Sequence, residues 1–482
     1  MNVIRKQSYH SISSPSPLVS LFQTNTTLSP LPMPRLGKTK SESLFEIISK
    51  NPYLTFEKSL EDVCVNLTPQ DVEEVLKLCY EFPTHAVKFF RWADPRINHN
   101  HSPYAWYLVI DILGKNRLFE PMWDWVKLMR REGLLSRSTF SSIFASYINA
   151  GRIDSAIKTF EVMDCYGCVR DVFSLNSLLN AICSSGRVVE ACDYLKIAKK
   201  HVKPDSDTYA ILMEGFESDG NVVGARDNFV EMIFEIGWEP ANVLAYDSFL
   251  CTLIKGSGGI CEAVKFFDSL SDMRCYPGIR FFGVALDECA KFHNLRRAKF
   301  FWEFMLGKTE LQPTTAMYNS MIALYCYHGD IDVAMKMLDE MVHREAFPDS
   351  LTYNLLLRYL IKGRKLLKAT RMFTEMVKNE CVPDQLNCHA AVKVYLDNGH
   401  TAMAIKVWKF LVENYREDLE RTANLLVVGL QNNGKVTEAV MYAKDIIRRG
   451  IKLTSSTLSK LLKAESGKRH IRYVSFLLKL HI

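Results

Sequence analysis

The sequence predicts an all-α fold, a right-handed superhelical solenoid of helix–turn–helix repeats of about 35 residues. Two observations support this fold class. Nine alanines recur at intervals of 34 to 38 residues, and such a period is typical of stacked helical hairpins. An apolar residue follows each alanine at the fourth and at the seventh position, which places all three on one face of an α-helix. The alanines are Ala156, Ala191, Ala225, Ala263, Ala298, Ala334, Ala369, Ala404 and Ala439.

Each repeat is expected to contain two helices joined by a turn. In the repeat 315–349, Tyr318, Ile322 and Tyr325 share one face of a first helix. Gly329 then ends this helix, because glycine readily adopts the left-handed conformation found at helix ends. Glycines stand at the same position in four other repeats, as Gly151, Gly186, Gly220 and Gly399. A Pro-Asp pair closes several repeats and ends the second helix, since the residue before proline avoids the α region.

These signals divide the chain into four parts. Residues 1–41 are predicted to be a disordered leader, 42–100 a degenerate N-terminal helical cap, and 101–453 an array of about ten repeats. Residues 454–482 are predicted to form a basic C-terminal helical cap. Three repeats in the middle of the array, over 206–314, are irregular in length.

The composition of residues 1–41 differs from that of the repeats. The segment contains eight serines, five prolines, Arg5 and Lys6 near its start, and no acidic residue. A basic, serine-rich and acid-free segment is typical of an organellar transit peptide, and a disordered tail without a targeting role is the alternative. The early Arg5 with Tyr9 and Ser11 favours the mitochondrion over the chloroplast.

The net charge of +6 is concentrated at the two ends of the chain. Residues 444–482 contain ten Lys or Arg against two acidic residues, which leaves 42–443 with a net charge of −7. The C-terminal end is therefore the part expected to attract phosphate. No apolar run reaches the roughly 18 residues of a membrane span, so no membrane partner is predicted.

Catalytic and metal chemistry find little support in the sequence. Cys165 and Cys168 form a CxxC motif, but no second pair follows at zinc-site spacing. His343 and Glu345 match the first half of a zinc-deaminase signature whose second half is missing. We therefore predict no catalytic residue, no metal site, no cofactor and free thiols.

Several segments resemble the opening of the pentatricopeptide repeat, namely Ser174–Leu179, Met317–Ile322 and Thr352–Leu356. The glycine turn, the Ala-x-x-x-Phe-x-x-Met helix and the closing Pro-Asp are similar to the rest of that repeat. The resemblance covers 101–453 and is closest to the P class of plant organellar members. The related tetratricopeptide repeat would require a Trp-x-x-Leu-Gly start, which no repeat has.

The resemblance implies binding of single-stranded RNA, with roughly one base read per repeat. In this family the base is read by the residue after the Tyr of the first helix together with the last residue of the repeat. Four such pairs match here, Ser141 with Asp171, Asn176 with Asp205, Asn319 with Asp349, and Asn354 with Asp384. Asn with Asp implies uridine and Ser with Asp implies guanosine, so the expected target is GU, three loosely specified nucleotides, then UU, read towards the 3′ end. Phe173 and Leu351 match the position that flanks the base.

The other repeats depart from the family's pairs and imply no base. Their residues at the two positions are Ala105 with Ser136, Ala210 with Asn242, Asp247 with Gly278, Gly283 with Thr314, His389 with Asp418, and Ala423 with Leu453.

The function expected from this resemblance is that of a monomeric, non-catalytic RNA-binding adaptor in an organelle. It would act in transcript stabilisation, end processing, splicing or translation, with ribosomal or RNA-processing proteins as further partners. The alternative is a structural or protein-interaction subunit, for example of the organellar ribosome, in which degenerate repeats would be tolerated.

Overall fold

The computed structural model describes residues 39–50, 60 and 66–465. The predicted leader lies outside the described residues except for its last three, and Lys40 and Ser41 already belong to the first helix. Residues 466–482 of the predicted C-terminal cap also lie outside them. The described residues form 24 α-helices and two short 3-10 helices, with no strand among them. The all-α solenoid predicted from the period is confirmed.

The chain divides into two compact units, Met1–Trp125 and Val126–Ile482. The helices of the first unit are α1 (Lys40–Lys50), α3 (Pro69–Leu78), α4 (Pro83–Ala93), η2 (Asp94–Ile97), α5 (Pro103–Lys115) and the start of α6 (Phe119–Arg131). Thr68 caps α3 by accepting a hydrogen bond from Asp71 N. An aromatic cluster fills the core of this unit, where the rings of Phe90 and His101 stack with centroids 3.6 Å apart.

The second unit repeats one hairpin along its length. The first helices of its hairpins are α7 (Arg137–Asn149), α9 (Val172–Ser184), α11 (Ser206–Asp219), α13 (Val243–Lys255), α15 (Ile279–Lys291), α17 (Thr315–Tyr327), α19 (Ser350–Lys362), α21 (Gln385–Asp397), α23 (Glu420–Asn432) and α25 (Ser455–Glu465). The second helices are α8 (Ile153–Glu161), α10 (Val188–Ala198), α12 (Val222–Ile236), α14 (Gly259–Asp272), α16 (Leu295–Lys308), α18 (Ile331–His343), α20 (Leu366–Lys378), α22 (Thr401–Asn414) and α24 (Val436–Arg448). The short η3 (Met163–Tyr166) follows α8.

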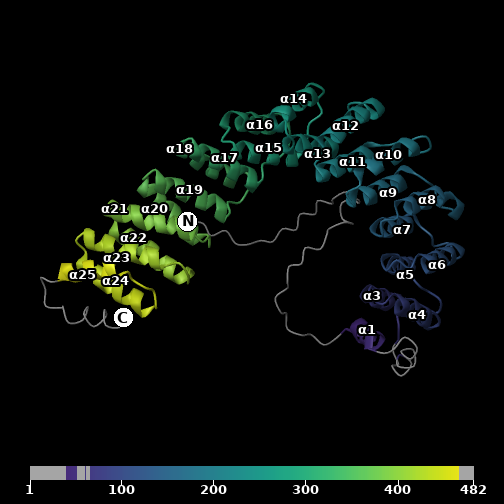
Figure 1. Ribbon diagram of the computed structural model, residues 1–482, viewed down its shortest axis with the longest axis horizontal. Coiled ribbons are helices and arrows are strands. Elements are labelled where there is room, and N and C mark those ends of the chain that lie inside the picture. The colour runs from purple at the N-terminus through teal and green to yellow at the C-terminus, as the bar shows by residue number, and fades with distance from the viewer. Residues whose placement is uncertain (1–38, 51–59, 61–65, 466–482) are drawn as a thin grey trace. The chain divides into compact units, whose positions relative to one another are not determined.

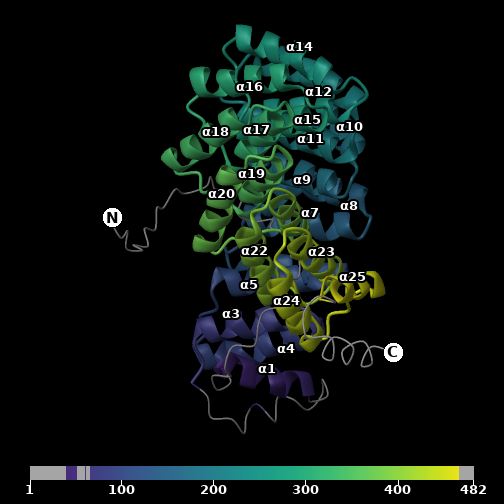
Figure 2. The same cartoon turned by 90° about the vertical axis from the view of Figure 1, so that its left-hand side faces the viewer.

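Within this unit, each first helix packs against the first helix of the next repeat. Figures 1 and 2 show these first helices as one layer, with the second helices forming a layer beside it. We call the two the first-helix layer and the second-helix layer. Every first helix therefore places its side chains in the same register, which is what a repeated binding surface requires.

The alanine column lies at the packing surface of the second helices. All nine alanines are fully buried, and the residues four and seven positions after each are at most 6% exposed. A small side chain lets the neighbouring helix approach, and the larger residues fill the remaining space. The packing role predicted for this column is confirmed.

The turns between the two helices have the predicted conformation. Gly151, Gly186, Gly220, Gly329 and Gly399 all have positive φ, between 69° and 86°. Arg364 stands at the same turn in the repeat that begins with α19, with a φ of 53°. This backbone conformation is strained for a residue with a β-carbon.

Replacing Arg364 with glycine is expected to raise the free energy of unfolding by about 0.5–1 kcal/mol, because relief of this strain outweighs the added freedom of the unfolded chain. The control is Gly329→Ala, which places a β-carbon at the same kind of turn and should destabilise the protein by a similar amount. Denaturant unfolding measures both, and a less stable Arg364→Gly protein would contradict the strain.

Candidate nucleic-acid interface

The predicted pairs lie on the first-helix layer, at two fixed positions of the repeat. One member is the fifth residue of a first helix, which we call the reading position. The other is the last residue of the repeat, which directly precedes the next first helix and which we call the cap position. Asp171, Asp205 and Asp349 at the cap position each accept a hydrogen bond from the backbone N–H three residues later, at 2.8–2.9 Å. These aspartates therefore also stabilise the helix that they precede.

Two of the four pairs form the same hydrogen-bond network. Asn176 Nδ2 donates to Asp205 Oδ1 at 3.0 Å, and Asn319 Nδ2 donates to Asp349 Oδ1 at 3.2 Å. In each repeat a threonine of the following helix donates to the asparagine Oδ1, Thr208 at 2.7 Å and Thr352 at 2.6 Å.

The charge of Asp349 is stabilised by these contacts. Burial acts to raise the pKa of Asp349, but hydrogen bonds from Thr352 and Asn319 bring it below its ordinary value. The carboxylate is therefore ionised at neutral pH and acts only as an acceptor, which fixes the orientation of the asparagine amide.

An amide in this network keeps hydrogen-bonding capacity for a ligand. An asparagine side chain offers two N–H donors and two lone pairs on oxygen. Among the described residues, Asn176 and Asn319 each use one donor and one lone pair. One donor and one acceptor therefore remain on each amide.

The pair Asn354 and Asp384 is arranged differently. Asn354 Nδ2 donates to the carbonyl oxygens of Ser350 and Val382, at 2.9 and 3.2 Å. Its Oδ1 accepts from Asp384 N at 2.7 Å and from Asn387 Nδ2 at 2.9 Å. All four sites of this amide are used, and no hydrogen bond between the described side chains of Asn354 and Asp384 is present. Asn387 stands here in place of the threonine found in the two regular networks.

Ser141 and Asp171 are not joined by a hydrogen bond among the described contacts. Ser141 Oγ donates to the carbonyl oxygen of Arg137 at 3.3 Å, and Asp171 forms an ion pair with the Arg137 guanidinium. The guanidinium also lies 5.3 Å from the centre of the Phe173 ring. Arg137 thus contacts both members of the pair, Ser141 through its carbonyl oxygen and Asp171 through its guanidinium.

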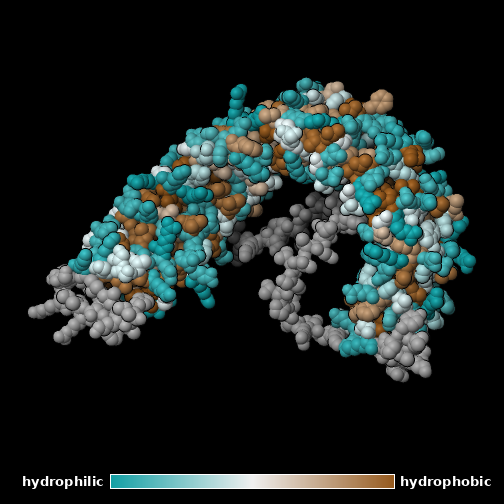
Figure 3. Space-filling model, in the orientation of Figure 1, coloured by the Kyte–Doolittle hydropathy of each residue, from teal (hydrophilic) through white to brown (hydrophobic). Residues whose placement is uncertain are grey.

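The base-flanking residues predicted from the sequence are exposed. Phe173 is 37% exposed and Leu351 is 56% exposed, although both are large and apolar. Two further leucines stand at the second position of a first helix, Leu244 and Leu386, with exposures of 52% and 80%. The sequence reading missed these two because their repeats lack a matching pair, but their register alone would have identified them. Figure 3 shows such apolar residues scattered over a largely hydrophilic visible surface.

A fourth asparagine stands at a reading position and was also missed. The last regular repeat was predicted to begin at 419, which assigned its pair to Ala423 and Leu453. In the structure α23 begins at Glu420, so the reading residue is Asn424, and Ala423 is fully buried. Asn424 Oδ1 accepts from Thr454 N at 2.8 Å, as Asn354 accepts from the residue at its cap position.

This error could have been avoided from the sequence. In the neighbouring repeats the alanine lies 19 residues after the first residue of the first helix, as for Ala404 and Gln385. Counting back from Ala439 gives Glu420, the observed start of α23.

The described part of the chain contains no disulfide and no cluster of metal-ligating side chains. Its twelve cysteines are free thiols, and no three His, Cys, Asp or Glu side chains gather where they could hold a metal ion. Among the helices described, none combines the length and apolar character needed to span a membrane.

Comparison with known proteins identifies the repeat. The family model described as "PPR repeat family" matches residues 170–218 and 313–362, and the model described as "PPR repeat" matches 104–134, 138–168 and 351–381. These segments coincide with hairpins of the structure. The chain belongs to the pentatricopeptide repeat family.

Its relatives include several proteins of Arabidopsis thaliana. The mitochondrial pentatricopeptide repeat-containing protein At1g77360 is 28% identical over 200 residues, which are 42% of this chain and 38% of the relative. The mitochondrial pentatricopeptide repeat-containing protein At5g15010 is 23% identical over 85% of this chain and 71% of its own length. The small ribosomal subunit protein mL103 (rPPR7) is 26% identical over 55% of this chain and 66% of its own. For the first of these, the match therefore spans well under two thirds of the relative.

Solved structures of the pentatricopeptide repeat protein PPR10 from maize are also similar. One covers 92% of this chain and 78% of its own at 16% identity, with a TM-score of 0.39. A second, of PPR10 in complex with an 18-nt psaJ RNA element, gives a TM-score of 0.38 at the same identity.

Proposed function

We propose that this pentatricopeptide repeat protein is a non-catalytic adaptor that binds single-stranded RNA along its first-helix layer. The observation that carries the proposal is the repeated network at Asn176 and Asn319. Each amide keeps one donor and one acceptor, and the Watson–Crick edge of uracil offers an N3–H donor beside a carbonyl acceptor. Two repeats far apart in the chain thus present the same complement to one base.

The base order follows from the position of each repeat. With the N-terminal repeats at the 5′ end of the RNA, the target is 5′-GUNNNUU-3′, where N is any nucleotide. The amides that would read the two uridines assigned to Asn176 and Asn319 are already oriented by hydrogen bonds to Asp205 and Asp349. The guanosine of Ser141 and the uridine of Asn354 require their side chains to exchange a present partner for the base.

We place the protein in the P class and its site of action in the mitochondrion, in transcript stabilisation, end processing, splicing or translation. The names of the relatives At1g77360 and At5g15010 include that organelle, and residues 1–41 have the composition of a transit peptide. A fluorescent protein fused behind residues 1–60 should enter mitochondria, and cytosolic fluorescence would contradict the location.

In vitro selection on a randomised single strand tests the RNA-binding role. Enrichment of two uridine sites separated as in 5′-GUNNNUU-3′ is expected for the full chain. No enrichment, or enrichment of an unrelated motif, would overturn the assignment of the reading positions.

A structural role in a mitochondrial ribosome is the second candidate. It is favoured by the relative whose name is small ribosomal subunit protein mL103, and by the repeats that lack a reading pair. Sedimentation of the endogenous protein with ribosomal subunits after RNase treatment would support this role over that of a free adaptor.

The C-terminal end is expected to contribute phosphate contacts. Arg448, Arg449 and Lys452 are exposed at the end of α24 and in the segment after it. Changing all three to glutamine should weaken binding equally for all RNA sequences and reduce the slope of log K against log salt by about 2, since each contact to a single strand contributes about 0.7.

The matched control changes three exposed lysines of the second-helix layer to glutamine, Lys336, Lys378 and Lys406. It removes the same net charge from α18, α20 and α22 instead of from the basic C-terminal end, so affinity and salt slope should change little. Equal effects of the two triple variants would show that only net charge matters.

A further inference from the structure

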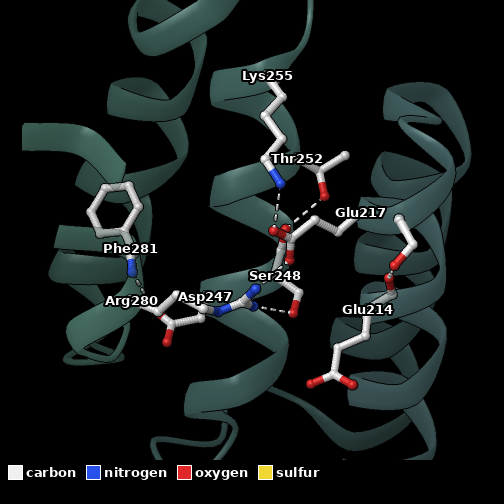
Figure 4. Close-up of polar contacts among 9 residues, drawn as sticks. Glu214, Glu217, Asp247, Ser248, Thr252, Lys255, Arg280 and Phe281 are labelled. Atoms are coloured by element: carbon white, nitrogen blue, oxygen red, sulfur yellow. Dashed lines mark hydrogen bonds and ion pairs between the residues drawn. The ribbon is translucent and has the colours of Figure 1, made fainter. Parts of the chain in front are cut away.

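The repeat that begins with α13 has an unusual pair, Asp247 at the reading position and Gly278 at the cap position. Gly278 has no side chain with which to cap α15. Asp247 performs this task from the reading position, because its Oδ1 accepts a hydrogen bond from Phe281 N at 3.1 Å (Figure 4). Its carboxylate also accepts from the backbone N–H of Gly278. Asp247 is only 4% exposed, as buried as the reading asparagines.

The carboxylate of Asp247 keeps acceptor capacity at the boundary between its repeat and the next. A carboxylate has about four lone-pair sites, and two are used by these backbone N–H groups. A β-carbon added at Gly278 would lie 2.6 Å from Asp247 Oδ2, so this oxygen faces the place where other repeats carry a cap-position side chain. Asp247 Oδ2 therefore takes up the place of the cap-position side chain that other repeats carry.

Two exposed side chains stand at the base-flanking positions of this repeat and of the next one. Leu244, the second residue of α13, is 52% exposed. Arg280, the second residue of α15, has a side chain that is 44% exposed. An arginine guanidinium is planar and stacks on bases, so it can replace the apolar residue found at this position elsewhere.

The orientation of Arg280 is fixed by residues from two other helices. Its Nη1 donates to Glu217 Oε2 at 2.7 Å and its Nη2 donates to Ser248 Oγ at 2.6 Å. Lys255 Nζ donates to the other oxygen of Glu217 at 2.9 Å. Figure 4 shows the side chains of Glu217 of α11 and Ser248 of α13 pointing towards the guanidinium of Arg280 of α15. The guanidinium is thus held before any ligand arrives, which reduces the entropy lost on binding.

We propose that this repeat selects guanine, with Asp247 accepting hydrogen bonds from N1–H and the 2-amino group and with Leu244 and Arg280 against the two faces of the base. This inference rests on the proposed RNA-binding function. An ionised carboxylate can only accept, and guanine is the one RNA base whose Watson–Crick edge presents two adjacent donors. Adenine and cytosine would place a ring-nitrogen acceptor against the carboxylate, and uracil would place carbonyl oxygens there.

The protonation state of Asp247 suits this role at neutral pH. Burial raises the pKa of Asp247 to about 6, while hydrogen bonds from Phe281 and Gly278 and the charge of Arg280 oppose the rise and Glu217 adds to it. The carboxylate is therefore mostly ionised at pH 7.5.

The test measures binding of the full chain at pH 7.5 to RNAs of the form 5′-GUNXNUU-3′, where X lies opposite the repeat that begins with α13. X is guanosine, adenosine, cytidine, uridine or inosine. Guanosine should bind about tenfold or more tightly than the other natural bases. Inosine, which lacks the 2-amino group, should lose most of this advantage.

Two variants separate reading at this repeat from general binding. Asp247→Asn keeps an acceptor for Phe281 N but places donors where the carboxylate had none, and it should abolish the preference for guanosine at X. Asn176→Ala should weaken binding to the whole series by the same factor and leave that preference intact. Thermal unfolding checks that both variants fold. If Asp247→Asn does not fold, the RNA series measured with the unchanged protein, inosine included, still tests the proposal.

The two proposals fail in distinguishable ways. A protein that binds none of the RNAs would contradict the proposed function. A protein that requires the flanking uridines but binds all five X nucleotides equally, or binds inosine as well as guanosine, would overturn the guanine site alone.

Discussion

Replacing Ala334 with leucine is expected to lower the free energy of unfolding by about 1–3 kcal/mol. Ala334 lies in α18 and is fully buried, and so are Leu338 and Met341, which follow it on the same face. α18 contacts both α17 of its own repeat and α19 of the next. Three extra carbon atoms at this contact would push helices apart or force side chains off their rotamers.

The neighbouring residue provides a matched control. Val333 belongs to the same helix but is 37% exposed, so Val333→Leu adds a carbon atom with little steric consequence. Its free energy of unfolding should change by less than about 0.5 kcal/mol. Denaturant unfolding of both variants measures the difference, and an Ala334→Leu protein as stable as the control would contradict the packing role of the alanine column.

The Ala334→Leu change should first destabilise α18 and the helices that contact it. Each repeat of a solenoid contacts only its neighbours, so a defect at α18 weakens the interfaces with α17 and α19 most directly. Hydrogen exchange of the Ala334→Leu protein should therefore increase first in α17, α18 and α19.

The parts of the fold that repeat could be predicted from the sequence. The alanines, their apolar partners and the turn glycines recur at a fixed spacing, and each depends on contacts within one repeat or with the next. Such contacts are local in a solenoid, so periodicity alone determines them. For this reason the period located the helical hairpins along the array, although the starts of the repeats containing α5 and α23 were placed two residues and one residue early.

The chemistry of individual reading positions could not be predicted in this way. Whether Asn354 Oδ1 keeps a free lone pair depends on Asn387, which lies 33 residues further along the chain and donates to it. Whether Asp247 faces a ligand depends on an absent side chain at Gly278. Both are properties of one repeat boundary, and a pattern averaged over all repeats contains no signal for either.

The structure also shows that reading and folding share residues at the cap position. Asp349 orients Asn319 and at the same time caps α19 through Thr352 N. Removing Asp349 would therefore cost about 1 kcal/mol of stability in addition to any effect on RNA. Variants that test base reading are better made at the asparagine, which caps no helix.

Changing Asn319 to serine is expected to shift the preference at its nucleotide from uridine towards guanosine. By the family's pattern, Ser with Asp implies guanosine. In the structure, the shorter side chain removes the amide donor that now contacts Asp349 and releases the hydroxyl of Thr352, which still contacts Asp349 Oδ1 at 2.9 Å. Asp349 stays at the site as an ionised acceptor, and an acceptor matches the donor-rich edge of guanine better than that of uracil.

The size of the shift and its confinement to one nucleotide make the outcome decisive. A good base contact contributes about 1–3 kcal/mol to discrimination, so selection with the Asn319→Ser protein should change the first of the paired uridines by about tenfold or more. The second should not change, because Asn354 forms a separate set of hydrogen bonds. Asn176→Ser provides a second test of the same network. It should shift the preference in the same way at the uridine of the GU pair. A shift at neither site would leave the solenoid intact but show that these asparagines do not read the base.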